Sequence, residues 1–388
     1  MAAHFPILVK CFAGLEAVLA AEMKQLDIAS VEEGKRAVHC QGDIRTVYQL
    51  NLHCRTALRV LIPIYGFEAE DEQDLYKGVR AIDWTDYLEP RSTLAVDSVV
   101  HSSVFRHSHY VALKVKDAIV DQFRDTVGKR PSVDVRRPDL RVHVHVRGTE
   151  VRILLDSSGD SLHKRGYRKR KSGAPINEAL AAGMVLLSGW KGDTPFVDGM
   201  CGAGTILLEA ALLAANRAPG LDRSFGFERW QDFDRKLWRE LLSDAKAAIQ
   251  TPQADLVGMD RDGTSLLSAQ DNLRRAGLYD QVRLEQTDFF QSDAPTKPGT
   301  LILNPPYGER MKEIDIEALY SQIGDQWKQA YPGFEAWMIS SNLPAMKRVG
   351  LRPYRKHILF NGPLECRYYG YQLYRGTKTE EAVPPTEG

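Results

Sequence analysis

The sequence predicts an α/β protein with an open parallel sheet in its C-terminal half and smaller α+β domains before it. Three observations lead to this fold class. From residue 176 on, short apolar strands alternate with helical segments, as in the βα units that build a parallel sheet. Three of these strands end in an acid and a fourth ends in an amide. The first 65 residues follow a shorter β-α-β-α-β order that is typical of a small α+β domain.

The composition is that of an ordinary globular protein, but the charge is unevenly distributed. Hydrophobic residues make up 43% and charged residues 26% of the 388 residues. Lys+Arg and Asp+Glu both number 51, so the net charge indicates no partner. Residues 101–173, in contrast, contain 17 Lys/Arg against 8 Asp/Glu. A basic region within a neutral chain favours an anionic partner for that region.

The cysteines and the N-terminus indicate a compartment. Five cysteines are scattered without a C-x-x-C pair, so neither zinc binding nor dithiol chemistry is expected and we predict no metal. An odd cysteine count and an N-terminus without a charged, then apolar, leader fit a reducing cytosol. No apolar run reaches 18 residues, so we expect no membrane span and a cytoplasmic protein.

The first domain is expected over residues 1–65 and shows no chemistry. Strands are predicted at residues 5–12, 38–40 and 58–65 by their apolar content. A helix is predicted from Gly14 to Met23, and Asp43 is the expected N-cap of a second helix through Leu52.

A second domain is expected over residues 66–160. It contains a predicted strand at 93–100, an amphipathic helix at 110–123 and a hairpin of strands 141–147 and 150–156. One face of the first hairpin strand is polar, with Arg141, His143, His145 and Arg147. This face is either the solvated side of a half-buried sheet or a phosphate-facing surface. Two histidines at i and i+2 lack a third metal ligand, so a metal site is not favoured.

A strongly basic segment follows and favours the phosphate-facing interpretation. Six of ten residues from Leu162 to Lys171 are cations, with one aromatic among them. The cations are Lys164, Arg165, Arg168, Lys169, Arg170 and Lys171. Such a run is often only a solvated linker, but here it extends a domain that is already basic, which is the electrostatic pattern of nucleic-acid binding. Residues 161–175 are therefore predicted to be a basic linker that ends at Ser172–Pro175.

The third domain is expected over residues 176–376 and carries a glycine-rich loop. A buried strand ends at Asp198, and a helix is predicted from Ile206 to Asn216. The loop between them contains Gly199, Cys201, Gly202, Gly204 and Thr205. Strand, glycine-rich loop and helix form the turn that binds nucleotides, although a plain strand-to-helix connection would also use glycines.

Polar residues at successive strand ends favour the nucleotide-binding alternative. Asp260, Asp288 and Asn304 end the next three predicted strands, at 255–260, 282–288 and 300–304. In a parallel sheet these ends meet at one edge, so we expect the side chains to line one cleft. An acid after the second strand suits a ribose diol, which Asp260 would bind.

Two other segments of this domain carry weaker signals. Residues 217–251 insert five aromatic side chains between a helix and a strand; a small satellite core is the expected role, and shielding of a ligand is the alternative. After a predicted helix at 316–330, strands are expected at 335–340, 356–360 and 364–374, and residues 377–388 are expected to be a disordered tail.

The stretch Asn304-Pro305-Pro306-Tyr307 closes the fourth strand and is the candidate catalytic site. The two prolines hold the chain extended. The Asn304 amide and free backbone carbonyls can then accept hydrogen bonds from an amino group, and Tyr307 offers a flat face to a planar ring. The stretch therefore predicts a planar substrate with an exocyclic NH2, although a proline-rich turn alone would have the same sequence.

Taken together, these motifs resemble the class I S-adenosylmethionine-dependent methyltransferases. Asp198-Gly-x-Cys-Gly-x-Gly resembles their first motif, Asp260 their ribose-binding acid and Asp288 the residue beside the adenine. Asn304-Pro-Pro-Tyr resembles the motif of amino-methyltransferases that act on nucleobases. With the basic α+β region and the Leu162–Arg168 segment, the whole chain resembles the THUMP-containing RNA guanine-N2 methyltransferases, above all the bacterial group acting on 23S ribosomal RNA.

This resemblance implies a fold, a cofactor and a reaction. The fold would be a Rossmann-like, doubly wound, seven-stranded methyltransferase domain preceded by ferredoxin-like and THUMP domains. S-adenosyl-L-methionine would donate a methyl group to guanine N2 in RNA, which would be 23S rRNA or a large-subunit precursor. Asn304 and Pro305 would accept the N2 hydrogens, and Tyr307 would stack on the base. Because some members carry a second methyltransferase domain and this chain stops at Gly388, only the N2-guanine activity is expected.

Three alternatives remain at this point. A tRNA guanine-N2 methyltransferase would share the same domains and motif. An adenine-N6 DNA methyltransferase would share Asn-Pro-Pro-Tyr but would leave residues 1–170 unexplained. An inactive RNA-binding protein with a relic cofactor fold is disfavoured by the intact glycines and acids.

Overall fold

The computed structural model describes residues 4–168, 176–308 and 315–374, which form two compact units. The first unit comprises the chain up to Cys11, Leu19–Lys164 and Arg223–Asp244. The second unit comprises Phe12–Val18, Arg165–Asp222 and the chain from Ala245 on. Lys169–Lys171, the end of the predicted linker and the predicted tail lie outside the described residues.

The first unit is built on one eight-stranded sheet with the order β2-β3-β1-β4-β8-β7-β5-β6. Its strands are β1 Phe5–Cys11, β2 Glu32–Gly34, β3 Ala37–Gly42, β4 Ala57–Glu68, β5 Thr93–His101, β6 Ser132–Val133, β7 Leu140–Arg147 and β8 Glu150–Asp156. The long strand β4 pairs with β1 on one side and with β8 on the other. The boundary predicted at residue 65 therefore falls inside a strand that both predicted N-terminal domains share.

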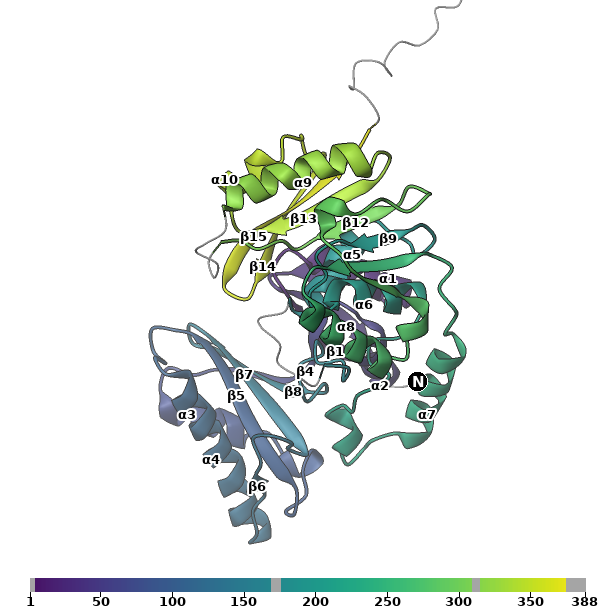
Figure 1. The fold of residues 1–388 in the computed structure, drawn as a ribbon. Helices are drawn as coiled ribbons and strands as arrows, with labels where there is room; N and C mark the ends of the chain where they lie inside the picture. Colours follow the sequence, from purple (N-terminus) through teal and green to yellow (C-terminus); the bar gives the residue numbers. More distant parts are fainter. Residues whose placement is uncertain (1–3, 169–175, 309–314, 375–388) are drawn as a thin grey trace, which may run out of the picture. The chain divides into compact units, whose positions relative to one another are not determined.

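The helices of this unit pack against that sheet. They include α1 Glu16–Gln25 (which begins in the second unit), α2 Ile44–His53, α3 Glu72–Arg80, η1 Trp84–Asp86 and α4 Ser108–Val127. Asp43 caps α2, as predicted: its carboxylate accepts the Thr46 N–H at 3.0 Å. Helix α4 extends beyond the predicted 110–123 and ends at Val127, and its C-cap Gly128 has φ of +72°. Helix α4 packs against β5, and α3 packs against α4 and β4 (Figure 1).

The second unit contains a seven-stranded sheet with the order β11-β10-β9-β12-β13-β15-β14. Its strands are β9 Phe196–Asp198, β10 Leu256–Asp260, β11 Arg283–Gln286, β12 Thr300–Leu303, β13 Glu335–Ser340, β14 Arg355–Asn361 and β15 Leu364–Gln372. Strands β9 to β13 run parallel, and β15 is antiparallel to both of its neighbours. The strand order reverses beside β9, which is where ligands bind in open α/β sheets.

Helices cover both faces of this sheet, so the doubly wound α/β fold is confirmed. They are α5 Glu178–Leu187, α6 Thr205–Ala214, α8 Gly263–Arg275, α9 Ile316–Ala330 and α10 Leu343–Arg348, with single turns η3 Tyr279–Gln281 and η4 Phe289–Gln291. Alternate strand residues enter two separate cores. Ile302 packs in the core that contains α5 and α6, while Leu301 and Leu303 pack in the core that contains α9 and α10. In the described part of the chain, no helix has the length and apolar character of a membrane span.

The aromatic insertion does not form a core of its own. It folds into η2 Phe227–Arg229 and α7 Arg235–Ala247, and most of it belongs to the first unit. Phe227 stacks on Tyr48 of α2 with 4.2 Å between ring centroids, and Trp238 meets Tyr48 edge-on at 5.8 Å. The predicted satellite core is therefore a shared cluster, because it includes a residue far away in the sequence.

Candidate active site

The glycine-rich loop connects β9 to α6 and needs its glycines. Gly204 has φ of +73°, and a Cβ there would lie 2.9 Å from the Ala269 side chain. A Cβ on Gly199 would lie 2.5 Å from the Phe289 ring. Gly202 also has a positive φ, of +53°. Side chains at these positions would force the loop out of its path, so the backbone N–H groups at the start of α6 stay accessible.

Asp260, at the end of β10, ties two loops together. Its Oδ2 accepts the Gly202 N–H at 2.8 Å and its Oδ1 accepts the Asp262 N–H at 2.9 Å. Asp262 in turn caps α8 by accepting the Thr264 N–H at 3.0 Å. Each carboxylate oxygen of Asp260 keeps a second lone pair, so the residue can still accept hydrogen bonds from a ligand's hydroxyl groups.

Asp198, at the end of β9, is buried and has no cationic partner among the described residues. It is 1% exposed, and neither carboxylate oxygen makes a well-aligned hydrogen bond within the described part of the chain. Burial raises the pKa of Asp198 to about 7, and the Asp260 carboxylate adds to this rise. The backbone N–H groups of Leu207 and Met200 partly offset these two effects. A buried acid of this kind is suited to receive a positively charged group.

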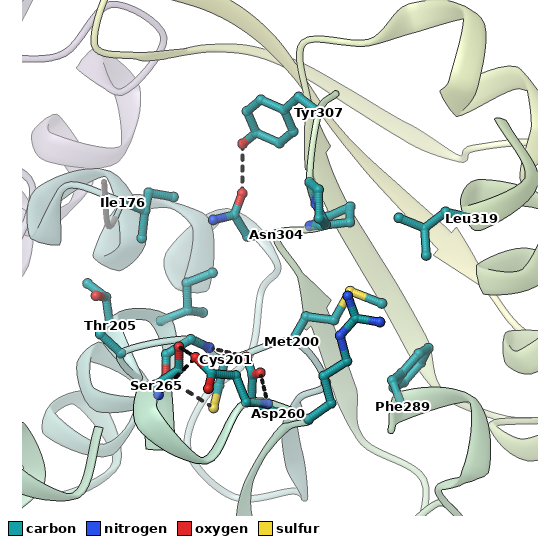
Figure 2. Close-up of a pocket in the computed structure, with 18 of the residues that line it drawn as sticks. Ile176, Met200, Cys201, Thr205, Asp260, Ser265, Phe289, Asn304, Tyr307 and Leu319 are labelled. Atoms are coloured by element: carbon teal, nitrogen blue, oxygen red, sulfur yellow. Dashed lines mark hydrogen bonds between the residues drawn. The ribbon is translucent and has the colours of Figure 1, made fainter. Parts of the chain in front are cut away.

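The Asn304–Tyr307 stretch follows directly after β12. The Tyr307 hydroxyl donates a hydrogen bond to Asn304 Oδ1 at 2.7 Å, and Figure 2 shows the two side chains facing each other. Two hydrogen bonds to backbone carbonyls hold this stretch in place. Asn342 Nδ2 donates to the Tyr307 carbonyl at 3.1 Å, and the Tyr320 hydroxyl donates to the Pro306 carbonyl at 3.3 Å. Burial, above all, raises the pKa of Tyr307, so its hydroxyl keeps its proton and acts as a donor.

One cavity of about 1330 Å³ brings these residues together. The predicted residues on its wall are Gly199, Cys201, Gly202, Thr205, Asp260, Asp288, Asn304, Pro305, Pro306 and Tyr307. Asp198 and Gly204 belong to the same loop region but are not on that wall. Single small-molecule sites usually measure about 300–1,000 Å³, so this cavity has room for two ligands side by side.

Several wall residues were not predicted from the sequence. They are Ile176, Met200, Arg261, Asp262, Thr264, Ser265, Ser268, Phe289, Phe290, Leu319, Gln322, Asn361, Pro363 and Leu364, among others. Most of those before residue 300 adjoin a predicted motif, so extending each motif by a few residues would have found them. The turn between β14 and β15, at 361–364, carries no such signal, because its place depends on the antiparallel end of the sheet.

The predicted basic face of β7 is not one exposed surface. Arg141 forms an ion pair with Asp97 at 2.8 Å, and His143 is buried with Nε2 3.2 Å from Asp156 Oδ2. Burial, then Lys10, lowers the pKa of His145 to about 4, so this side chain is neutral at pH 7. Arg147 is exposed. The alternating pattern misled here because the sheet continues past β8 to β4, where Arg59 also contacts Asp156.

The basic segment is also partly internal. Lys164 is exposed and pairs with Asp160 at 3.0 Å. Arg165 is buried, 3.4 Å from Glu209 of α6, and Tyr167 donates to the same carboxylate at 3.0 Å. Arg168 pairs with Glu178 at 3.1 Å and donates to the Thr205 hydroxyl at 2.6 Å.

Arg165 and Arg168 stabilise the second unit, because the buried carboxylates of Glu209 and Glu178 require partners. Burial therefore argues against direct RNA contact by His143 and Arg165. Among the described residues, no three His, Cys, Asp or Glu side chains gather in a metal-sized cluster.

Comparisons with known proteins agree with this architecture. Residues 165–370 match the model of the RMKL-like methyltransferase domain. Residues 69–156 match the THUMP domain, and residues 6–61 match the RlmL ferredoxin-like domain.

Relatives and a solved structure extend the match to nearly the whole chain. A putative RNA methyltransferase of Synechocystis is 39% identical over 93% of this chain and 95% of its own length. The ribosomal RNA large subunit methyltransferase K/L of Syntrophotalea carbinolica is 38% identical over 93% of this chain. The chain spans about half the length of that relative, 52%. The crystal structure of a putative methyltransferase complexed with SAH has a TM-score of 0.88 and 31% identity, and the match covers 97% of this chain and all of that one. The chain therefore belongs to the RMKL-like methyltransferase family, with a THUMP domain and an RlmL ferredoxin-like domain before its catalytic domain.

Proposed function

We propose that the protein transfers a methyl group from S-adenosyl-L-methionine to the exocyclic N2 of a guanosine in structured RNA, namely large-subunit ribosomal RNA. One observation carries the proposal. Asn304, whose amide oxygen accepts a hydrogen bond from Tyr307, lies on the wall of the cavity that also contains the glycine-rich loop and Asp260. The relatives named ribosomal RNA large subunit methyltransferase K/L and the THUMP domain support RNA as the substrate.

The residues at the strand ends fit S-adenosyl-L-methionine. Gly199 and Gly204 let the loop lie close against Phe289 and Ala269, and a Cβ on Gly202 would meet nothing within 4 Å, so the space beside Gly202 is open to a ligand. Asp260 offers its free lone pairs to a ribose diol. Asp198, which is not on the cavity wall and has no cationic partner among the described residues, attracts the ammonium group by its charge. Asp288 is on the cavity wall, where it would lie beside the adenine of the bound cofactor. When bound, the cofactor supplies an electrophilic methyl group on sulfur.

The protein's part in the reaction is to position the base. The lone pair of guanine N2 is delocalised into the ring, so the amino group is a weak nucleophile. Asn304 Oδ1 and the Pro305 carbonyl accept the two N2 hydrogens, which localises the lone pair and aims it at the methyl group. Proton loss follows methyl transfer, so no dedicated general base is required.

Tyr307 has a second role besides stacking on the base. Its hydroxyl donates a hydrogen bond to Asn304 Oδ1. This bond holds the amide group in one orientation, with its oxygen and not its nitrogen next to the hydroxyl. Oδ1 keeps a second lone pair for the substrate amino group. The base leaves its stack to enter the cavity, and the N-terminal domains hold the RNA by its shape and phosphates. The cytoplasmic location stays a prediction from the sequence.

Nucleoside mass spectrometry tests the proposed function. Digests of 23S rRNA and tRNA from cells with and without the gene are compared, and the purified chain is then incubated with the undermethylated RNA. We expect N2-methylguanosine to decrease in 23S rRNA alone and to be restored by the chain. A loss confined to tRNA, or a loss of N6-methyladenine from DNA, would contradict the proposal.

Replacement of Asn304 tests the acceptor role. Asn304→Ala removes the oxygen, and we expect turnover to fall by about 10²–10³-fold while the Kd for S-adenosyl-L-methionine changes little. Asn304→Asp keeps an acceptor at the same place and should retain more activity than the alanine variant. Single-turnover kinetics and calorimetry provide the two measurements. Equal loss of cofactor binding and turnover would rule out this assignment.

Replacement of Tyr307 separates orientation from stacking. Tyr307→Phe keeps the ring and removes the hydroxyl, so we expect kcat to fall about three- to tenfold, the worth of one hydrogen bond. Tyr307→Ala also removes the ring and should lower activity further. Both are measured at saturating cofactor. A phenylalanine variant with wild-type kcat would show that the hydroxyl does not orient Asn304.

The raised pKa of Asp198 predicts how cofactor binding depends on pH. Without a ligand this pKa lies at about 7 because the carboxyl group is buried. A bound ammonium group stabilises the ionised form and lowers the pKa, so binding below pH 7 must release a proton. Affinity should therefore rise with pH up to about 7 and level off above about 8.

Calorimetry from pH 5.5 to 8.5 measures this dependence, and two buffers of different ionisation enthalpy at pH 6 count the released proton. Asp198→Asn should bind the cofactor more weakly, with a flatter pH profile. An affinity for the cofactor that does not vary with pH in the wild type would refute the assignment of Asp198 to the ammonium group.

A further inference from the structure

The loop after α4 carries a dense group of free cations. Between Gly128 and Pro138 it contains Lys129, Arg130, Arg136 and Arg137. All four side chains are exposed, and none of them forms an ion pair with a residue that the structure describes. In this they differ from Arg141, Lys164 and Arg168, each of which has an acidic partner. Four cations against one acid, Asp134, within nine residues leave a net positive charge, which favours an anion beside them.

The one acid of this loop serves the backbone. Asp134 Oδ1 accepts the Arg136 N–H at 2.8 Å and the Arg137 N–H at 3.0 Å. These two hydrogen bonds, that of Arg137 first, lower the pKa of Asp134. Asp134 therefore shapes the turn that presents both arginines, and their guanidinium groups remain available.

Hydrogen bonds to neighbouring parts of the first unit also hold this loop in place. The Ser132 N–H donates to the Ser92 carbonyl at 3.1 Å, which attaches β6 to the sheet. The Arg141 guanidinium donates to the Val135 carbonyl and the Arg229 Nε to the Pro138 carbonyl, both at 2.8 Å. A loop held by such contacts loses little backbone freedom on binding, so its cations are preorganised.

The apolar residues of the loop suit a partner that is not uniformly charged. Val133 is 51% and Val135 69% exposed, between the two pairs of cations. Nucleic acid combines phosphates with ribose and base surfaces, and arginine forks bind phosphate oxygens in pairs. A second explanation is that the cations keep the edge strand β6 from pairing with another chain.

We propose that the Lys129–Arg137 loop is a phosphate-contacting surface for the structured RNA substrate. The inference rests on the proposed function for its partner. It places RNA-binding charge at the β6 edge of the first unit and not on the strand face 141–147.

The test removes the four charges in the full chain, as Lys129→Gln, Arg130→Gln, Arg136→Gln and Arg137→Gln together. The matched control makes the same change in charge at four scattered cations that are exposed and unpaired among the described residues. These are Lys24, Lys35, Lys236 and Arg239. Filter binding to a 23S rRNA fragment from 50 to 300 mM KCl gives the Kd and its salt slope, and methyl transfer gives kcat and KM.

We expect the loop variant to raise the Kd for RNA by about tenfold or more and to reduce the slope of log Kd against log salt by about 3. KM for RNA should rise, whereas kcat and cofactor affinity stay as in the wild type. The control should change the slope much less. Replacement of the three arginines by lysine keeps the charge and should keep the slope, which separates charge from folding defects.

Three results would overturn the inference. The first is a loop variant with the salt slope of the control. The second is self-association of the variant with unchanged RNA binding, which would assign the cations to edge protection. The third is binding of polyglutamate as tight as that of RNA and lost in the same variant, which would indicate an acidic protein partner. A wild type that binds RNA with the expected slope but does not methylate guanine N2 would refute the proposed function and leave the loop assignment standing.

Discussion

The carboxylate of Asp260 is the contact on which the site depends. It accepts the N–H of Gly202 after β9 and the N–H of Asp262 after β10, so one side chain holds the loops of two neighbouring parallel strands. The pairing of Gly258 with Asp198 sets those strand ends side by side. Without the carboxylate, two loop N–H groups would lose their acceptor, and the glycine-rich loop would lose the contact that sets its distance from α8. The shape of the cavity therefore depends on these two hydrogen bonds of Asp260 as well as on packing.

The same sheet edge tolerates polar groups that would be costly elsewhere. Asp198 is buried without a well-aligned protein partner, and Asn304 uses one lone pair of its amide oxygen for Tyr307. Apolar side chains on both faces of the sheet, such as Ile302 on one and Leu301 on the other, stabilise the strands that carry these groups. The raised pKa of Asp198 reflects the cost of burying its charged form. Apolar side chains along the strands thus stabilise the fold, and the polar groups lie where the strands end.

Local patterns in the sequence predicted the second unit well. The strand ends at Asp198, Asp260 and Asn304 and the helix at 316–330 follow from short-range periodicity, and parallel topology then brings the polar ends together. The sequence could not predict features that depend on distant pairing. The strand β4 extends one sheet through both N-terminal domains, and Tyr48 completes the aromatic cluster of the insertion from a position about 180 residues earlier. The burial of His143 follows from the same sheet continuity, because its partner Asp156 belongs to the strand that pairs with β4.

The arginines show why a count of charges does not locate a binding surface. Arg165 and Arg168 belong to the densest basic run of the chain, yet each lies against a buried glutamate of an apolar helix, Glu209 or Glu178. A buried carboxylate without a partner would cost several kcal/mol, so these cations are required within the fold. Arg136 and Arg137 differ, because Asp134 between the cations binds backbone N–H groups and neither arginine forms an ion pair with a residue that the structure describes. The availability of a cation is therefore decided by its acidic neighbours in three dimensions, and an RNA-binding surface is to be sought where exposed cations have none.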